Sequence, residues 1–105
     1  MPTGVWINGA SGRMGQVATL AIENDPDLHI AGKSHRTDDL AACIRNIEPD
    51  VVLDLTTATV AYTNATTIID AGVSPVIGTS GLLPHQTDEL VAICEDRKLG
   101  GAIIP

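Results

Sequence analysis

The feature that most constrains the fold of this chain is a regular alternation of two kinds of segment. Short runs rich in β-branched and other apolar residues are separated by longer runs in which apolar residues recur at helical spacing. The connections between them are only a few residues long, which favours a parallel sheet with right-handed crossovers. We predict strands over residues 5–7, 28–32, 51–55, 74–78 and from 100 onward, and helices over residues 12–24, 37–47, 58–72 and 84–99.

These segments fit a single domain, because a chain of 105 residues can bury roughly two thirds of its unfolded surface in one core. We therefore predict an α/β fold over residues 1–105, a Rossmann-type doubly wound parallel sheet of about five strands in three layers. No apolar run approaches the roughly 18 residues of a membrane span, and no basic leader precedes the first strand. A cytoplasmic protein without a membrane partner is expected.

Spacing within the predicted helices indicates which side chains are buried and where each helix begins and ends. The first helix has one apolar face, which we expect to pack on the sheet. Its members are Met14, Val17, Leu20 and Ala21. Thr37 is the expected N-cap of the second helix. The third helix is expected to close at Gly72, because glycine readily adopts the conformation that ends a helix.

Charge and aromatic content argue against nucleic acid as a partner. The net charge of −7 arises after residue 36, since residues 1–36 hold three basic and three acidic side chains and residues 37–105 hold three and ten. Nucleic-acid surfaces need a basic stripe and stacking aromatics, but Trp6 and Tyr62 are the only aromatic residues in this chain. A small anionic ligand, held by the neutral first third, is compatible with this distribution.

The sequence "GASGRMG" at residues 9–15 places three glycines between the first predicted strand and the first predicted helix. Absent side chains there let backbone N–H groups approach a pyrophosphate, and the N-terminus of a helix favours negative charge. The spacing differs from the commoner G-x-G-x-x-G, and a purely structural turn is the alternative. We predict a dinucleotide-binding loop that uses Gly9, Ser11, Gly12, Arg13, Met14 and Gly15.

The end of the second predicted strand bears on which dinucleotide is bound. A site for NAD usually has Asp or Glu there, whereas this stretch reads "GKSHRTDD", with its first acid at Asp38 in the next predicted helix. Basic side chains offer charge-assisted hydrogen bonds to a 2′-phosphate that a carboxylate would repel. A solvated basic loop is the alternative. We predict a preference for NADPH over NADH, carried by Lys33, Ser34, His35 and Arg36.

Two further loops belong to the candidate site, because open doubly wound sheets bind ligands beyond the carboxyl ends of their strands. These loops are residues 56–58 and 78–81. No catalytic set, metal site or disulfide is predicted, because the residues that could form one are scattered over separate segments. The scattered residues are His29, His35, His85, Cys43 and Cys94.

Three motifs, "INGASGRMG", "DVVLDLTTA" and "VIGTSGL", resemble in sequence and order the N-terminal domain of the 4-hydroxy-tetrahydrodipicolinate reductase family. The resemblance covers nearly all 105 residues and implies a nicotinamide-dependent reductase of lysine biosynthesis through diaminopimelate. It implies that the glycine loop contacts the pyrophosphate and that residues 54–56 and 78–81 face the nicotinamide and its ribose. The cofactor-binding positions implied in these loops include Leu55, Thr56, Thr57, Gly78, Thr79 and Ser80.

The chain also departs from the pattern of that family. Leu55 replaces a phenylalanine beside the cofactor, and Leu83 replaces a Thr or Ser that would cap the last helix. The family's second domain, which carries a His-His pair and a catalytic lysine for the cyclic dicarboxylate substrate, has no counterpart in these residues. We therefore expect this chain to bind NADPH or NADH without catalysing the reaction. The alternatives are a stand-alone dinucleotide-binding module or sensor, and a nucleotide-binding subunit that holds coenzyme A at residues 78–81.

Overall fold

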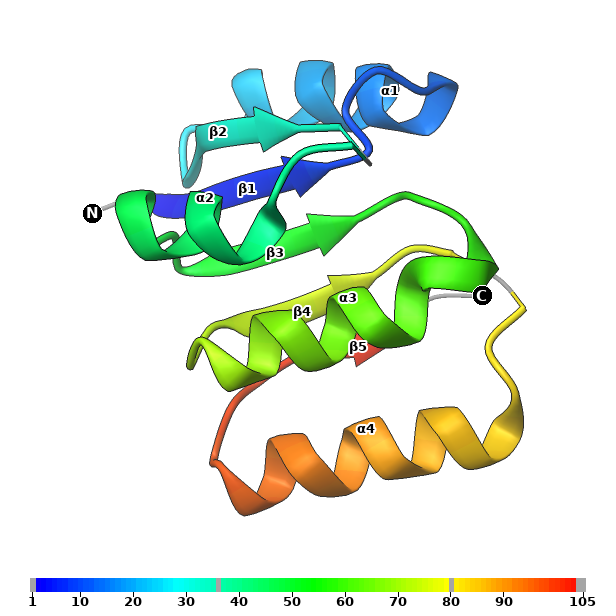
Figure 1. Cartoon of the computed structure of the whole chain (residues 1–105). Coiled ribbons are helices and arrows are strands. Elements are labelled where there is room, and N and C mark those ends of the chain that lie inside the picture. Colours follow the sequence, from blue (N-terminus) through cyan, green and yellow to red (C-terminus); the bar gives the residue numbers. More distant parts are fainter. Residues whose placement is uncertain (1, 36, 80, 104–105) are drawn as a thin grey trace.

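The computed structural model describes residues 2–35, 37–79 and 81–103, and its five strands form one parallel sheet (Figure 1). The strands lie in the order β2-β1-β3-β4-β5, and every neighbouring pair is parallel. The chain therefore builds the sheet outward from β1, first to one side and then to the other, which confirms the predicted doubly wound α/β fold. The strands are β1 (Thr3–Asn8), β2 (Leu28–Ser34), β3 (Val51–Asp54), β4 (Ser74–Ile77) and β5 (Ala102–Ile103).

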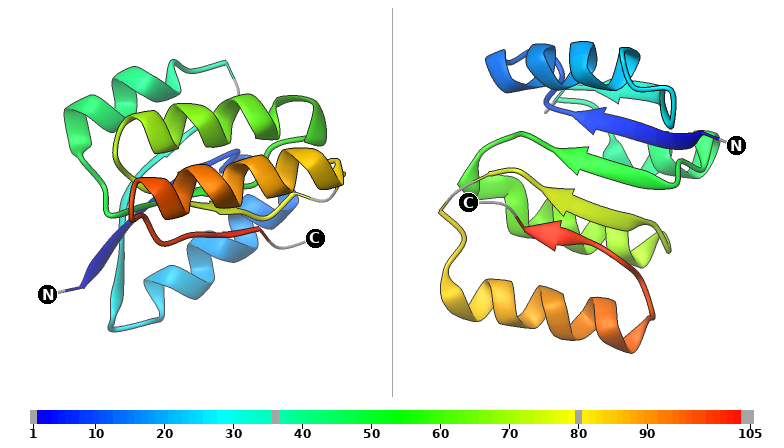
Figure 2. Two further views of the ribbon diagram at one scale, coloured as in Figure 1. Left: turned by 90° about the horizontal axis from the view of Figure 1, so that it is seen from below. Right: turned by 180° about the vertical axis from the view of Figure 1, so that it is seen from behind.

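The helices that connect these strands are α1 (Arg13–Glu23), α2 (Leu40–Ile47), α3 (Ala58–Asp70) and α4 (Pro84–Asp96). Helix α1 lies on one face of the sheet, whereas α2, α3 and α4 lie together on the other face (Figure 2). Right-handed crossovers produce this arrangement, because α1 leads from β1 toward β2 and the other helices lead across the sheet in the opposite direction. The result is the predicted three-layer architecture.

The hydrophobic core is divided unequally between the two faces of the sheet. Helices α2, α3 and α4 enclose the larger cluster, in which Val52, Ile68 and Ile77 are fully buried. The cluster that includes α1 is smaller. Its buried members are Val5, Ile7, Ala10 and Ile22.

Helix α1 packs through a different face from the one we predicted. Met14, Val17 and Leu20 are 60%, 56% and 62% exposed. The cause is the close approach of α1 to the preceding loop, because a methyl group at Gly15 would lie only 2.7 Å from the Ala10 backbone. This contact brings another face of the helix onto the sheet. The residues that α1 buries are Gly15, Thr19 and Ile22.

The ends of the helices follow local capping chemistry. Helix α2 begins at Leu40 because Asp39, and not the predicted Thr37, is its N-cap, with Oδ1 accepting a hydrogen bond from Ala42 N–H at 3.1 Å. Helix α3 closes as predicted just before Gly72, whose φ of +76° suits glycine. None of the described helices is long and apolar enough to cross a membrane.

Candidate functional site

The loops that follow the parallel strands meet at one edge of the sheet, at the right of Figure 1. At this edge the order of the strands reverses between β1 and β3, which is where doubly wound sheets bind their ligands. Backbone hydrogen bonds join the loops, since Gly9 N–H donates to Ser34 O and Leu55 N–H donates to Asn8 O, both at 2.9 Å. The structure therefore brings together the four loops that the sequence nominated.

The glycines of the loop after β1 have different environments. Gly9 has a φ of +84°, and a methyl group there would lie 2.9 Å from the Leu55 carbonyl group. Gly15 packs on Ala10, as described above. Gly12, the N-cap of α1, differs because the nearest atom to a methyl group there would be Gly9 O, at 3.7 Å. Gly12 therefore faces space that a ligand can enter.

The first turn of α1 presents backbone donors beside this space. Gln16 N–H donates to Gly12 O at 3.0 Å, which begins the helical hydrogen bonds. Among the described residues, no acceptor is found for the N–H groups of Arg13, Met14 and Gly15. Free donors at the positive end of a helix form a ready binding place for an anion such as a pyrophosphate.

The side chains around the glycine loop are exposed, including those of Ser11, Arg13 and Met14. The Ser11 carbonyl oxygen accepts a hydrogen bond from Gln16 Nε2 at 3.1 Å, which links the loop to the first turn of α1. Within the described part of the chain, the Arg13 guanidinium forms no ion pair. It can therefore turn toward a bound anion without breaking an ion pair.

The end of β2 presents both basic and acidic groups. Lys33 and His35 are exposed, but Ser34 is only 1% exposed and its hydroxyl is bonded within the protein. Asp38 lies in the loop and not in α2, contrary to our prediction. Its Oδ2 accepts a hydrogen bond from His35 N–H at 2.7 Å. The loop just after β2 therefore carries the Asp38 carboxylate, which the sequence had placed in the next helix.

The loops after β3 and β4 contact one another. Leu55 lies against Gly78, where a methyl group would be 2.6 Å from Leu55 Cδ2. The Thr79 hydroxyl donates to Thr56 O at 3.2 Å, so these two half-buried threonines join the loops. The exposed Thr57 hydroxyl shares a hydrogen bond with the Thr59 hydroxyl in the first turn of α3, at 3.0 Å. Two predicted contacts lie outside the described residues, namely Arg36 and Ser80.

Asp54, the last residue of β3, does not face the site as the family resemblance implied. Its side chain is completely buried, and its Oδ1 accepts hydrogen bonds from Thr56 Oγ1 at 2.8 Å and Asn8 Nδ2 at 3.2 Å. Asn64 Nδ2, from α3, lies 3.3 Å from Oδ2. Burial raises the pKa of the Asp54 carboxyl above its ordinary value of 3.8, and these hydrogen bonds offset the effect only in part.

The hydrogen bonds continue from Asp54 across the sheet. The Ser34 hydroxyl donates to Asn8 Oδ1 at 2.7 Å and accepts from Trp6 Nε1 at 2.8 Å. Our sequence reasoning missed Asn8 and Asn64. Asn8 had a signal, because three predicted strand regions have a polar residue at or near their carboxyl ends, whereas Asn64 lies within the third helix and had none. We call the connected set the Asp54 network, which consists of Trp6, Asn8, Ser34, Asp54, Thr56 and Asn64.

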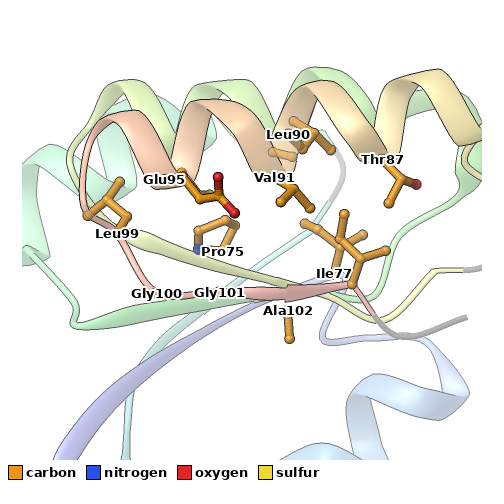
Figure 3. A pocket seen from close by; sticks show the side chains of 13 residues that line it. Pro75, Ile77, Thr87, Leu90, Val91, Glu95, Leu99, Gly100, Gly101 and Ala102 are labelled. Atoms are coloured by element: carbon orange, nitrogen blue, oxygen red, sulfur yellow. The ribbon is translucent and has the colours of Figure 1, made fainter.

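Other parts of the described chain offer less chemistry. Within residues 2–35, 37–79 and 81–103, no group of three or more His, Cys, Asp or Glu side chains could hold a metal ion. A hollow of about 390 Å³ lies between α4 and strands β4 and β5, with mostly apolar walls that include Pro75, Leu90 and Leu99 (Figure 3). None of the predicted cofactor contacts lines it. The carboxyl edge of the sheet is therefore the candidate site.

Comparison with known sequences gives one consistent family. The model of "Dihydrodipicolinate reductase, N-terminus" matches residues 3–105. The 4-hydroxy-tetrahydrodipicolinate reductase of Legionella pneumophila (strain Corby) is 44% identical over all 105 residues, and that of Coxiella burnetii (strain Dugway 5J108-111) is 41% identical. The chain spans only 43% and 44% of the lengths of these two relatives.

Solved structures give the same fold. A dipicolinate-bound dihydrodipicolinate reductase from Paenisporosarcina sp. TG-14 matches all of this chain and 48% of its own chain, with a TM-score of 0.89 and 26% identity. GenD2 from gentamicin A biosynthesis, solved in complex with NAD, matches 98% of this chain and 34% of its own, with a TM-score of 0.87 and 19% identity. At that identity, the likeness to GenD2 concerns the fold alone.

Proposed function

This chain belongs to the family of dihydrodipicolinate reductase N-terminal domains, and we propose that it binds the nicotinamide dinucleotide of such a reductase. The observation that carries the proposal is the space at Gly12, which adjoins the free N–H groups in the first turn of α1. A pyrophosphate fits this place because it needs close backbone approach and several donors. The location between β1 and β3 supports the same ligand.

The proposed site has a phosphate side and a nicotinamide side. The reduced nicotinamide supplies a hydride when it is bound, and the residues of this chain hold and orient it. The proposed contacts on the phosphate side are Gly9, Ser11, Gly12, Arg13, Met14 and Gly15. Those on the nicotinamide side are Leu55, Thr56, Thr57, Gly78, Thr79 and Ser80.

We assign the complete reaction to a longer protein, because the chain spans less than half the length of the curated relatives that it matches. In this proposal, residues 1–105 are the dinucleotide-binding domain, and the remainder of such a protein supplies the site for the cyclic dicarboxylate substrate. The proposed setting is lysine biosynthesis through diaminopimelate, in the cytoplasm. We expect the 105-residue chain alone to bind cofactor and not to reduce the substrate.

A preference for NADPH over NADH is the finer part of the proposal. Lys33 and His35 are exposed at the end of β2, where they can form charge-assisted hydrogen bonds to a 2′-phosphate. Asp38 supports NADH as the alternative, because a carboxylate at this position can accept hydrogen bonds from ribose hydroxyls. Asp38 already accepts the His35 N–H, however, so part of its hydrogen-bonding capacity is used within the loop.

Titration of the chain with NADPH and with NADH, followed by energy transfer from Trp6, tests both parts of this proposal. We expect NADPH to bind about tenfold more tightly. Lys33→Ala should reduce this ratio, whereas Arg45→Ala, which removes an exposed cation in the last turn of α2, should leave it unchanged. Equal affinities in the unmodified chain would contradict the preference. Failure to bind either dinucleotide would contradict the proposed function itself.

A further inference from the structure

We propose that Asp54 is a positioning residue, which orients the loops after β3 and β4 for the nicotinamide end of the cofactor. This inference rests on the proposed function. Asp54 cannot touch the cofactor itself, because its side chain is fully buried. It acts through Thr56, whose hydroxyl donates to Asp54 Oδ1 at 2.8 Å and whose carbonyl oxygen accepts a hydrogen bond from the Thr79 hydroxyl at 3.2 Å.

The register of the sheet places the members of the Asp54 network side by side. Asn8 is the register partner of Ser34 in β2 and of Asp54 in β3, so the last residues of three strands stand in one row. Asn8 connects the other two, because it accepts from Ser34 and donates to Asp54. The row lies directly under the candidate site, since the loops of that site begin at the next residue of each strand.

The direction of the hydrogen bonds makes Asp54 the end of this row. Trp6 donates to Ser34, Ser34 donates to Asn8, and Asn8 donates to the Asp54 carboxylate. The side chains of Thr56 and Asn64 also donate to Asp54, so each side chain that hydrogen-bonds to this carboxylate acts as a donor. Both oxygens of a carboxylate accept hydrogen bonds. An asparagine side chain has the same shape, but its NH₂ group would face the donors that surround this position.

The network adds something that the backbone does not provide. Backbone hydrogen bonds already hold the strand ends, including Leu55 N–H to Asn8 O and Gly78 N–H to Asp54 O, both at 2.9 Å. They do not fix the Thr56 side chain, which is held by Asp54 and by Asn64 Nδ2 at 3.2 Å. Loss of the Asp54 acceptor should therefore release Thr56 while the sheet itself remains formed.

The test compares binding of NADPH with binding of 2′,5′-ADP, which contains only the adenosine end of the cofactor. Asp54→Asn should weaken NADPH binding about tenfold, as expected when a hydrogen bond to a charged group is lost. Binding of 2′,5′-ADP should change less than about twofold, because the side chains that donate to Asp54 are those of Asn8, Thr56 and Asn64, which lie outside the glycine loop. A purely structural role would weaken both ligands alike.

Asp50→Asn is the matched control, because Asp50 lies just before β3, at the opposite edge of the sheet, and its Oδ2 accepts from Gly4 N–H at 2.7 Å. It should change neither affinity. Thr56→Val should weaken NADPH binding as well, and its effect should not add to that of Asp54→Asn, since both act through one side chain. If Asp54→Asn does not fold, Asn64→Ala tests the link with the same two ligands, because it removes another hydrogen bond that holds the Thr56 side chain and Asn64 is not a proposed cofactor contact.

Three results would overturn the inference. One is an unchanged affinity of Asp54→Asn for NADPH, and another is an equal loss for NADPH and 2′,5′-ADP. The third is full additivity of Asp54→Asn and Thr56→Val, which would show that the two residues act independently. Failure of the unmodified chain to bind NADPH would instead overturn the proposed function, and this inference with it.

Discussion

The two sides of the proposed cofactor site are built in opposite ways. On the phosphate side, absent side chains let the backbone approach both the adjoining protein and a ligand, at Gly15 and Gly12 respectively. On the nicotinamide side, buried polar side chains hold the loops, with Asp54 as their common acceptor. One side therefore depends on space and the other on hydrogen-bond partners, so the two should respond differently to substitution.

The largest effect is expected where the glycine loop meets α1. Gly15→Ala places a methyl group 2.7 Å from the backbone of Ala10, which cannot move aside as a flexible side chain can. We expect the free energy of unfolding to fall by roughly 3 kcal/mol or more. Urea denaturation followed by circular dichroism would measure this change.

Gly12→Ala provides the matched control for Gly15→Ala. It is the same substitution in the same loop, but the nearest contact of the new methyl group is Gly9 O, at 3.7 Å. Its effect on the free energy of unfolding should stay within about 1 kcal/mol. Equal losses in the two variants would show that the glycines do not have separate roles.

The next effect concerns binding. Gly12→Val should fill the space beside the free N–H groups of α1 and lower the affinity for NADPH about 100-fold, or about 2.8 kcal/mol. Its free energy of unfolding should change by less than about 1 kcal/mol, because no described atom lies near enough to clash with Cβ. Titration by energy transfer from Trp6 would measure the affinity.

Ala21→Val, toward the far end of α1, is the control for Gly12→Val because it places a valine side chain on the exposed surface of the same helix, away from the site and without a change of charge. Its affinity for NADPH should equal that of the unmodified chain. If Gly12→Val also bound normally, the glycine loop would be a structural turn, and the phosphate side of the site would have to lie elsewhere.

Much of the fold could be predicted from the sequence because each strand and helix carries its own local pattern. The buried face of α1 could not. Met14, Val17 and Leu20 form as regular an apolar stripe as a core-facing helix would have, yet they are exposed. The buried face includes Gly15, which lies close to the Ala10 backbone, and a residue without a side chain adds nothing to a hydrophobic pattern.

The same contrast applies to the site. The glycine loop is continuous in sequence, so its residues could be nominated before the structure was known. The Asp54 network joins β1, β2, β3 and α3, and its partners are set by the register that pairs Asn8 with both Ser34 and Asp54. Register is a property of the assembled sheet, so the sequence could nominate polar residues at the strand ends but could not show which of them pair with Asp54.

The smallest expected effect is a change of stability with pH, which tests the nicotinamide side of the site through the charge of Asp54. Burial raises the pKa of the Asp54 carboxyl above its ordinary value of 3.8, despite hydrogen bonds from Thr56, Asn64 and Asn8. Below the ordinary value, the carboxyl is protonated in both the folded and the unfolded chain. At that pH the folded chain holds the Asp54 carboxyl in its neutral form, which burial favours. As the pH rises through the raised pKa, the folded chain must hold a buried carboxylate instead, and the stability that comes from the neutral form is lost.

Asp54→Asn cannot titrate at this position. The free energy of unfolding of the unmodified chain, minus that of Asp54→Asn, should therefore fall as the pH rises above the ordinary value of 3.8, by about 1.4 kcal/mol for each unit by which the pKa is raised. Asp50→Asn, with the same change of net charge at the opposite edge of the sheet, controls for general electrostatic effects. A difference that instead rises with pH would mean that the hydrogen bonds outweigh burial. The Asp54 carboxylate would then stabilise the nicotinamide side. The phosphate side depends on absent side chains, so the two sides would differ more clearly.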